Sequence, residues 1–231
     1  MGRGDEPALT GAEPSGPKQS GPGQPGTLPS DTSRGARAGS SELPLFPLNT
    51  VLFPGGPLPL RIFEPRYVDM VRSCMREGAP FGVVLIREGQ EAGAVSSAAD
   101  VGTSARVVDF DQMPDGLLGI VCTGEQKFRV EDRRVQGDGL NIGTVTWLPP
   151  EPPTPLPPEF AHLGLLMRRA LPKLGEIYAA LPAQFDDAGW VGARLAEILP
   201  ISLGDRQECL ELDDPLARLG RLAPLIRPAE G

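Results

Sequence analysis

The segment that decides the fold runs from residue 43 to residue 67 and reads Leu43-Pro-Leu-Phe-Pro-Leu-Asn-Thr-Val-Leu-Phe-Pro-Gly-Gly-Pro-Leu-Pro-Leu-Arg-Ile-Phe-Glu-Pro-Arg-Tyr67. Apolar residues alternate with proline over residues 43–48, and a second alternating run covers residues 59–63. Alternation with a period of two is typical of a strand. Because proline has no N–H to donate to a ladder, the first run is predicted to be an edge strand or an extended arm.

A helix is predicted directly after these strands. Glu64-Pro65 begins it, because proline at the first helical position loses an N–H that would be unpaired anyway. Gly78 is predicted to end it. One apolar stripe follows at helical spacing and comprises Tyr67, Met70, Val71, Cys74 and Met75.

The next part of the chain is predicted to be rich in strands. Turn signals such as Met113-Pro-Asp-Gly116 separate short apolar or alternating runs, a pattern typical of a barrel or a sandwich. The predicted strands cover residues 81–86, a part of 101–110, 117–122, 126–131 and 142–147.

Composition divides the chain into four parts. Residues 1–42 are rich in glycine, proline and serine and hold no aromatic residue, so they are predicted to form a disordered tail. Residues 43–148 form a β-rich lobe and residues 149–158 a stiff proline-rich linker. Residues 159–228 form a helical lobe, in which apolar residues recur with a period of 3.6. The predicted fold class is therefore α+β.

The helical lobe carries its own start and stop signals. Pro172 is predicted to kink or break the first helix, and Pro200 to stop the second. Ser202 and Asp214-Pro215 are predicted to begin the third and the fourth. Four residues are expected to face inward from the fourth helix, namely Leu216, Leu219, Ala223 and Ile226.

Composition also excludes several classes of function. The chain has a net charge of −8, which argues against binding to nucleic acid or to an anionic membrane. It has three lysines, and none follows a glycine as in a phosphate-binding loop, so no nucleotide is expected. No apolar run reaches the length of a membrane span, and the first residues lack a secretory pattern. A cytoplasmic location is therefore expected.

Few side chains offer chemistry of their own. Cys74, Cys122 and Cys209 have no zinc or redox spacing, and each is expected to be a small buried hydrophobe. His162 has no catalytic partner and is expected at the surface, and Lys127 is expected to be an exposed strand residue. No catalytic, cofactor-binding or metal-binding residue is assigned.

Acidic residues occur in close pairs. Those at positions 186–187 and 213–214 precede predicted helices, where a carboxylate caps free N–H groups and suits the helix dipole. Asp109 and Asp111 share one face near the end of a predicted strand. The pair Asp109 and Asp111 leaves open the alternative of a small metal-dependent enzyme, although it lacks a third ligand.

Several motifs recur together in a fixed order. They are Leu43-Pro-Leu-Phe-Pro-Leu48, Val51-Leu-Phe-Pro54, Leu58-Pro-Leu60, Ile62-Phe-Glu-Pro-Arg-Tyr67, Val101-Gly-Thr103, Met113-Pro-Asp-Gly116, Gly124-Glu-Gln-Lys-Phe-Arg-Val130 and Ile198-Leu-Pro-Ile201. In this order they resemble the N-terminal, substrate-binding domain of the Lon protease family. The resemblance implies a PUA-like β pseudo-barrel followed by a helical bundle, with residues 43–228 as one domain.

The resemblance also implies a function. Full Lon proteases continue into an ATPase module and a Ser–Lys peptidase module, whereas this chain resembles the stand-alone Lon-domain proteins that carry neither. It implies a non-enzymatic module that binds unfolded or partner polypeptide in protein quality control, without a cofactor. PUA-like barrels often bind RNA, so an RNA-binding module is an alternative, which the acidic charge disfavours.

Four residues are candidates for polypeptide contact. Leu45 and Phe46 lie on the predicted edge strand, which could accept an extended peptide by backbone pairing. Phe53 and Pro54 lie in an apolar loop rich in glycine and proline. The alternative is that such side chains fill the barrel.

Six further residues are expected to be structural. Leu60 and Phe63 are expected to fill the barrel. The remaining four match the family motif and are expected to tie the first helix to the barrel; they are Arg61, Glu64, Arg66 and Tyr67.

Overall fold

Strands make up most of the first part of the described chain and helices the second, as the α+β class predicts. The structure is a computed structural model that describes residues 39–89, 95–113 and 116–226. The strands are β1 (Ser40–Leu48), β2 (Pro57–Ile62), β3 (Phe81–Gly89), β4 (Val95–Ala98), β5 (Val101–Gln112), β6 (Leu118–Val135) and β7 (Asn141–Trp147). The helices are α1 (Pro65–Glu77), α2 (Ala161–Ala170), α3 (Glu176–Ala179), α4 (Ala188–Ile198), α5 (Leu203–Glu211) and α6 (Pro215–Leu222), with 3-10 turns at Pro158–Phe160, Leu171–Lys173 and Ala223–Leu225.

Most of the predicted tail, residues 1–38, lies outside the described residues, as do Pro114 and Asp115 of the predicted turn. The strand β1 begins at Ser40, before the predicted start at Leu43.

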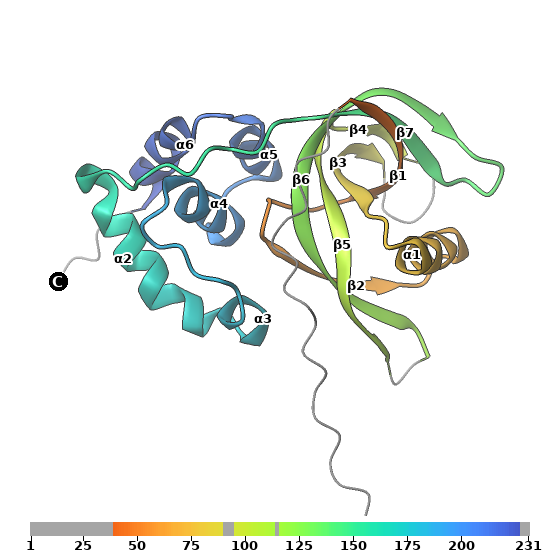
Figure 1. Ribbon diagram of the computed structural model, residues 1–231, viewed down its shortest axis with the longest axis horizontal. Helices are drawn as coiled ribbons and strands as arrows, with labels where there is room; N and C mark the ends of the chain where they lie inside the picture. The colour runs from red at the N-terminus through yellow and green to blue at the C-terminus, as the bar shows by residue number, and fades with distance from the viewer. Residues whose placement is uncertain (1–38, 90–94, 114–115, 227–231) are drawn as a thin grey trace, which may run out of the picture. The chain divides into compact units, whose positions relative to one another are not determined.

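The strands pair in the order β1-β7-β6-β5-β3, and a parallel pairing of β1 with β3 joins the two ends into a ring (Figure 1). The prediction that residues 43–48 form an edge strand is therefore wrong. β7 pairs with residues 40–45 of β1 and β3 pairs with residues 45–48. Each proline lies in a half of β1 that has one partner, so its missing N–H can face the unpaired side.

The long strand β6 organises the sheet. The sequence predicts two strands here, over 117–122 and 126–131, but residues Leu118–Val135 form this single strand. Its register shifts against β5 and against β7, and such bulges bend a strand strongly. One strand can therefore pair with β2 and β5 at its beginning and with β7 at its end.

The helix α1 forms as the sequence predicts. It begins at Pro65, and Gly78 ends it in the left-handed conformation, with φ of 63°. The apolar stripe is buried except for Met75, which is partly exposed. Tyr67 stacks on Phe46 of β1, with ring centroids 4.0 Å apart, and so fixes the helix against the sheet.

The predicted signals lie at boundaries of α2, α4, α5 and α6. A 3-10 turn that contains Pro172 follows α2. The side chains of Asp187, Ser202 and Asp214 accept hydrogen bonds from backbone N–H groups in the first turns of α4, α5 and α6. Leu219 is buried, as expected, and Ala223 and Ile226 pack against the same core, but Leu216 is 37% exposed, so the expectation for Leu216 is wrong.

Residues 149–158, called the connecting segment below, pack against the helices. The N–H of Leu156 donates to the carbonyl of Asp186 at 2.8 Å, and that of Thr154 donates to the Asp187 carboxylate at 2.9 Å. The side chain of Leu156 joins the core of the helices. The segment is extended, and these contacts hold it in place.

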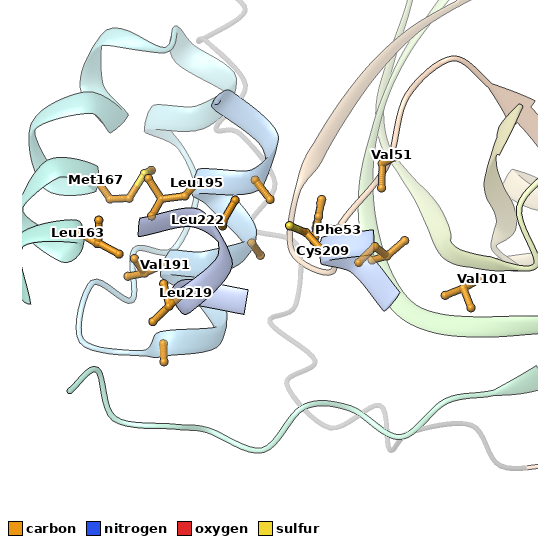
Figure 2. Packing of buried hydrophobic residues seen from close by; sticks show 14 of the residues in the cluster. Val51, Phe53, Val101, Leu163, Met167, Val191, Leu195, Cys209, Leu219 and Leu222 are labelled. Atoms are coloured by element: carbon orange, nitrogen blue, oxygen red, sulfur yellow. The ribbon is translucent and has the colours of Figure 1, made fainter. Parts of the chain in front are cut away.

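A shared core joins strands and helices. Val51, Phe53 and Val101 pack in the same cluster as residues of α2, α4, α5 and α6 (Figure 2). Phe53 and Cys209 of α5 both belong to this cluster (Figure 2).

A buried ionic cluster reinforces the same junction. Lys127 of β6 is 3% exposed, so the prediction of an exposed strand residue is wrong. Its Nζ lies 3.1 Å from Glu151 Oε1 and 2.9 Å from Asp213 Oδ1, and it donates to the carbonyl of Leu210. Glu151 also accepts two hydrogen bonds, at 2.6 and 2.8 Å, from the buried guanidinium of Arg218 on α6. The connecting segment thus supplies one carboxylate to two buried cations.

The charges around Glu151 set its protonation. Burial alone would raise the pKa of this carboxyl, but the hydrogen bonds and positive charges of Arg218 and Lys127 outweigh burial and hold the pKa below its usual value. Glu151 is therefore ionised at neutral pH.

The substitution Glu151→Gln is expected to lower the free energy of unfolding by about 3 kcal/mol, because it leaves two buried cations without their shared carboxylate. Urea denaturation followed by circular dichroism measures the loss. Asp100→Asn is the control, since Asp100 pairs with Arg133 at an exposed position, where an ion pair contributes about 1 kcal/mol or less. Equal losses for the two variants would contradict the role given to Glu151.

Candidate functional site

A row of apolar side chains crosses β2, β6 and β5 where these strands run together. Leu60 of β2 is opposite Ile120 of β6, and Ile120 is opposite Phe110 of β5. Residues directly opposite in antiparallel strands share a face, so these three side chains form one row. Ile120 is buried, Leu60 is partly buried and Phe110 is 59% exposed. The apolar row therefore runs from the core into solvent.

Two more apolar side chains are exposed close in sequence to members of this row, one near Phe110 and one near Leu60. Val108 of β5 is 52% exposed, and it lies at a shift of register between β5 and β6. Phe63 is 58% exposed, so the expectation that it fills the barrel is wrong. It follows Ile62, the last paired residue of β2, and precedes the start of α1.

The same part of β5 has an open edge. β3 pairs with residues 103–105 of β5, and within the described ranges residues 106–112 pair with β6 alone. Figure 1 shows β5 and β6 as a long ribbon with β2 beside one end of it. We call this surface, made of Phe110 and the open edge of β5 over residues 106–112, the ribbon end.

Two carboxylates accompany the ribbon end. The N–H of Phe110 donates to Asp109 Oδ1 at 2.9 Å, and both Asp109 and Asp111 are exposed. A charged side chain on a strand edge is a common protection against unwanted pairing. Over the part of the chain that the structure describes, no group of three potential ligands gathers around these residues or elsewhere to hold a metal ion.

The four residues predicted to contact polypeptide lie elsewhere. Leu45, Phe46 and Phe53 are buried, and Pro54 is partly buried. The carbonyl of Pro54 accepts a hydrogen bond from Arg194 of α4 at 3.0 Å, so this loop faces the helices. Polypeptide contact through these four residues stays a prediction, and the burial of three of them gives it no support.

The motif residues lie at the junction of α1 with the sheet. Glu64 precedes α1 but forms no side-chain cap; it pairs with Arg66 at 2.7 Å. Arg66 donates to the carbonyl of Gly139 in the β6–β7 turn at 2.8 Å, and its guanidinium lies 4.7 Å from the ring centroid of Tyr67. These contacts connect α1 to the β6–β7 turn. Arg61 is exposed on β2.

The cysteines are buried, as predicted, and free. Burial raises the pKa of the Cys74 thiol to about 11 and that of Cys122 to about 12, with nearby negative groups adding to the effect. Burial also raises the pKa of Cys209. A thiol with a raised pKa carries little of the nucleophilic thiolate at neutral pH. His162 is exposed on α2, as expected.

A second buried ion pair lies against the loop that holds Pro54. Arg194 of α4 donates to Glu197 at 2.7 Å as well as to Pro54. A Cβ added to Gly56 would lie 2.1 Å from Glu197 Oε1, so only glycine lets this loop approach the pair so closely. The hydroxyl of Tyr178 donates to Glu197 Oε2 at 3.4 Å.

The carboxyl of Glu197 has a pKa close to neutral pH. Burial raises the pKa of Glu197 to about 7, against the opposing charge and hydrogen bond of Arg194 and smaller contributions from Tyr178 and Arg206. The folded chain therefore binds a proton at Glu197 between about pH 4.5 and 7, where the unfolded chain releases it.

Glu197 is thus expected to make the fold more stable as the pH falls from about 8 to 5. The gain is up to about 3 kcal/mol, because one unit of pKa corresponds to about 1.4 kcal/mol. Urea denaturation at several pH values should show a weaker dependence of this sign in Glu197→Gln than in the unaltered chain. The exposed Glu176→Gln should keep the original dependence. An unchanged pH profile in Glu197→Gln would contradict the assignment.

Comparison with known proteins places the chain in a family. A profile described as ATP-dependent protease La (LON) substrate-binding domain matches residues 42–227. A crystal structure of a Lon N-terminal domain protein from Xanthomonas campestris is 41% identical in sequence, with a TM-score of 0.68; the match covers 81% of this chain and 99% of that one. The N-terminal domain of a Mycobacterium avium complex Lon protease is 15% identical, with a TM-score of 0.57 over 80% of this chain and 97% of that one, and shows the same fold.

Longer proteins are similar over a part of their length. A Lon protease of Paraburkholderia phytofirmans is 31% identical over 206 residues, which cover 83% of this chain and 25% of that protein. Protein cereblon of Danio rerio is 32% identical over 111 residues, or 46% of this chain and 25% of that protein. The chain thus spans about a quarter of the length of these relatives.

The mixed sheet with its helices matches Lon N-terminal domain structures, as the sequence motifs predict. No helix in the described ranges is both long enough and apolar enough to cross a membrane. The chain belongs to the Lon substrate-binding domain family.

Proposed function

We propose that this chain is a polypeptide-recognition module that binds unfolded or partner protein at the ribbon end. The observation that carries the proposal is the row of apolar side chains that leads to Phe110 beside an open strand edge. Membership of a substrate-binding domain family supports it. An extended segment would add to the edge of β5 through backbone hydrogen bonds, a recognised mode of peptide binding.

Binding at the ribbon end is expected to be weak and tolerant of sequence. Full burial of a Phe side chain contributes about 1.5–3 kcal/mol, and Phe110 is 59% exposed. Association costs several kcal/mol in lost freedom of motion. Backbone pairing along β5 must therefore supply much of the affinity, and backbone groups are the same in every sequence. The incoming strand would replace the bond between Phe110 N–H and Asp109.

The proposal places the module in protein quality control in the cytoplasm, where it recognises polypeptide and carries out no cleavage itself. Three free, buried cysteines suit a reducing compartment. The alternative of an RNA-binding module gains no support at this surface, because Asp109 and Asp111 would repel phosphate.

The substitution Phe110→Ser is expected to weaken binding of a permanently unfolded polypeptide, such as a reduced and carboxymethylated protein, about fivefold or more. It removes apolar area that the bound segment would bury, worth about 1 kcal/mol or more. Fluorescence anisotropy of the labelled polypeptide measures the affinity.

Leu165→Ser is the matched control, because Leu165 is 56% exposed on α2, outside the ribbon end. It should leave the affinity unchanged, and both variants should unfold at the same urea concentration as the original chain. Binding that survives Phe110→Ser unchanged, or no binding by the unaltered chain, would overturn the proposal.

A further inference from the structure

A second concave surface lies between α1, the start of β1 and the β6–β7 turn. It is a groove of about 930 Å³, within the usual range of ligand sites. Figure 1 shows the β6–β7 hairpin extending on the side of the sheet where α1 lies. The bond from Arg66 to the carbonyl of Gly139 links helix and hairpin along this groove.

The groove has an apolar floor. Its lining includes large apolar side chains that also form the core of the sheet, and these are Leu43, Met70, Leu140, Ile142 and Trp147. Core packing holds these side chains in place on the sides that face away from the groove. The floor of the groove is therefore a fixed surface. It could cover the aliphatic part of a bound side chain.

Carboxylates dominate the charge of the lining. Four acidic residues line the groove, namely Glu42, Asp69, Glu77 and Asp138. Arg66 is the one basic residue in that lining, and it is already engaged with Glu64 at 2.7 Å and with Gly139. The groove therefore favours a cationic occupant and disfavours an anionic one.

Three of these carboxylates have arginine partners that do not line the groove. Asp69 lies 3.6 Å from Arg72, Glu77 lies 3.5 Å from Arg76, and Glu42 lies 3.0 Å from Arg134. All six side chains are at least half-exposed. Such exposed pairs contribute about 1 kcal/mol or less, so an incoming cation can share or replace the arginine.

We propose that this groove binds an extended basic segment of polypeptide. Lysine or arginine head groups would meet the rim carboxylates, and their aliphatic stems and neighbouring apolar residues would cover the floor. The inference rests on the proposed function in taking polypeptide as the ligand, but it uses a surface distinct from the ribbon end. It adds a preference by charge to binding that is otherwise tolerant of sequence.

The test uses the full chain and three fluorescein-labelled peptides of equal length. They alternate lysine with leucine, glutamate with leucine, and lysine with serine. The lysine–leucine peptide should bind at least tenfold more tightly than either of the others, and added salt should weaken it. If the lysine–serine peptide binds equally well, the interaction is a diffuse attraction of cations without apolar contact. If the glutamate–leucine peptide binds equally well, the groove has no preference for positive charge. Either result would overturn the proposal.

Paired variants locate the site. Asp69→Asn with Glu77→Gln should weaken the lysine–leucine peptide at least fivefold, whereas Glu159→Gln with Glu176→Gln, exposed residues of the helical part, should not. Both double variants change the net charge by the same amount. Equal losses of affinity for the lysine–leucine peptide would therefore show an effect of net charge alone and would overturn the proposal for the groove.

The Phe110→Ser variant separates the two proposals. This variant should bind the lysine–leucine peptide with unchanged affinity. If its affinity for that peptide falls as much as its affinity for the unfolded polypeptide, the peptide binds at the ribbon end, and the proposal for the groove is overturned. If the unaltered chain does not bind the unfolded polypeptide but binds the lysine–leucine peptide through Asp69 and Glu77, the proposal for the groove is supported and the proposal for the ribbon end is overturned.

Discussion

The carboxylate of Glu151 holds two buried cations that come from opposite ends of the domain. Lys127 is on the longest strand and Arg218 is on the last α-helix, and Glu151 is the carboxylate that both cations share, while Asp213 also pairs with Lys127. The connecting segment that carries Glu151 is therefore a fixed element of the fold. With the apolar cluster around Phe53, it holds strands and helices together and leaves the ribbon end and the α1 groove exposed.

Local chemistry allowed much of the fold to be predicted from sequence. Pro65 and Gly78 delimit α1, and Asp187, Ser202 and Asp214 begin three later helices, because each effect acts within one turn of the chain. Long-range pairing could not be predicted in the same way. Nothing near β1 shows that β3 will close the ring against it, and Lys127 has the alternating neighbours of an exposed strand residue.

The candidate site illustrates the same limit. Phe46, Phe53, Phe63 and Phe110 are all aromatic residues in strand-like or proline-rich surroundings, yet two are buried and two are exposed. The difference arises from partners that are distant in sequence: Tyr67 covers Phe46, the helices cover Phe53, and Phe110 lies on a part of β5 that β3 does not reach. Only the register of β5 against β3 and β6 reveals the open edge.

Hydrogen–deuterium exchange on the full chain, with and without a permanently unfolded polypeptide, tests the central claim most directly. Strand addition at the ribbon end predicts that backbone amides within residues 106–112 exchange more slowly in the complex, while those of residues 45–48, which already pair with β3, do not change. Protection confined to the helices, with none in residues 106–112, would contradict the account.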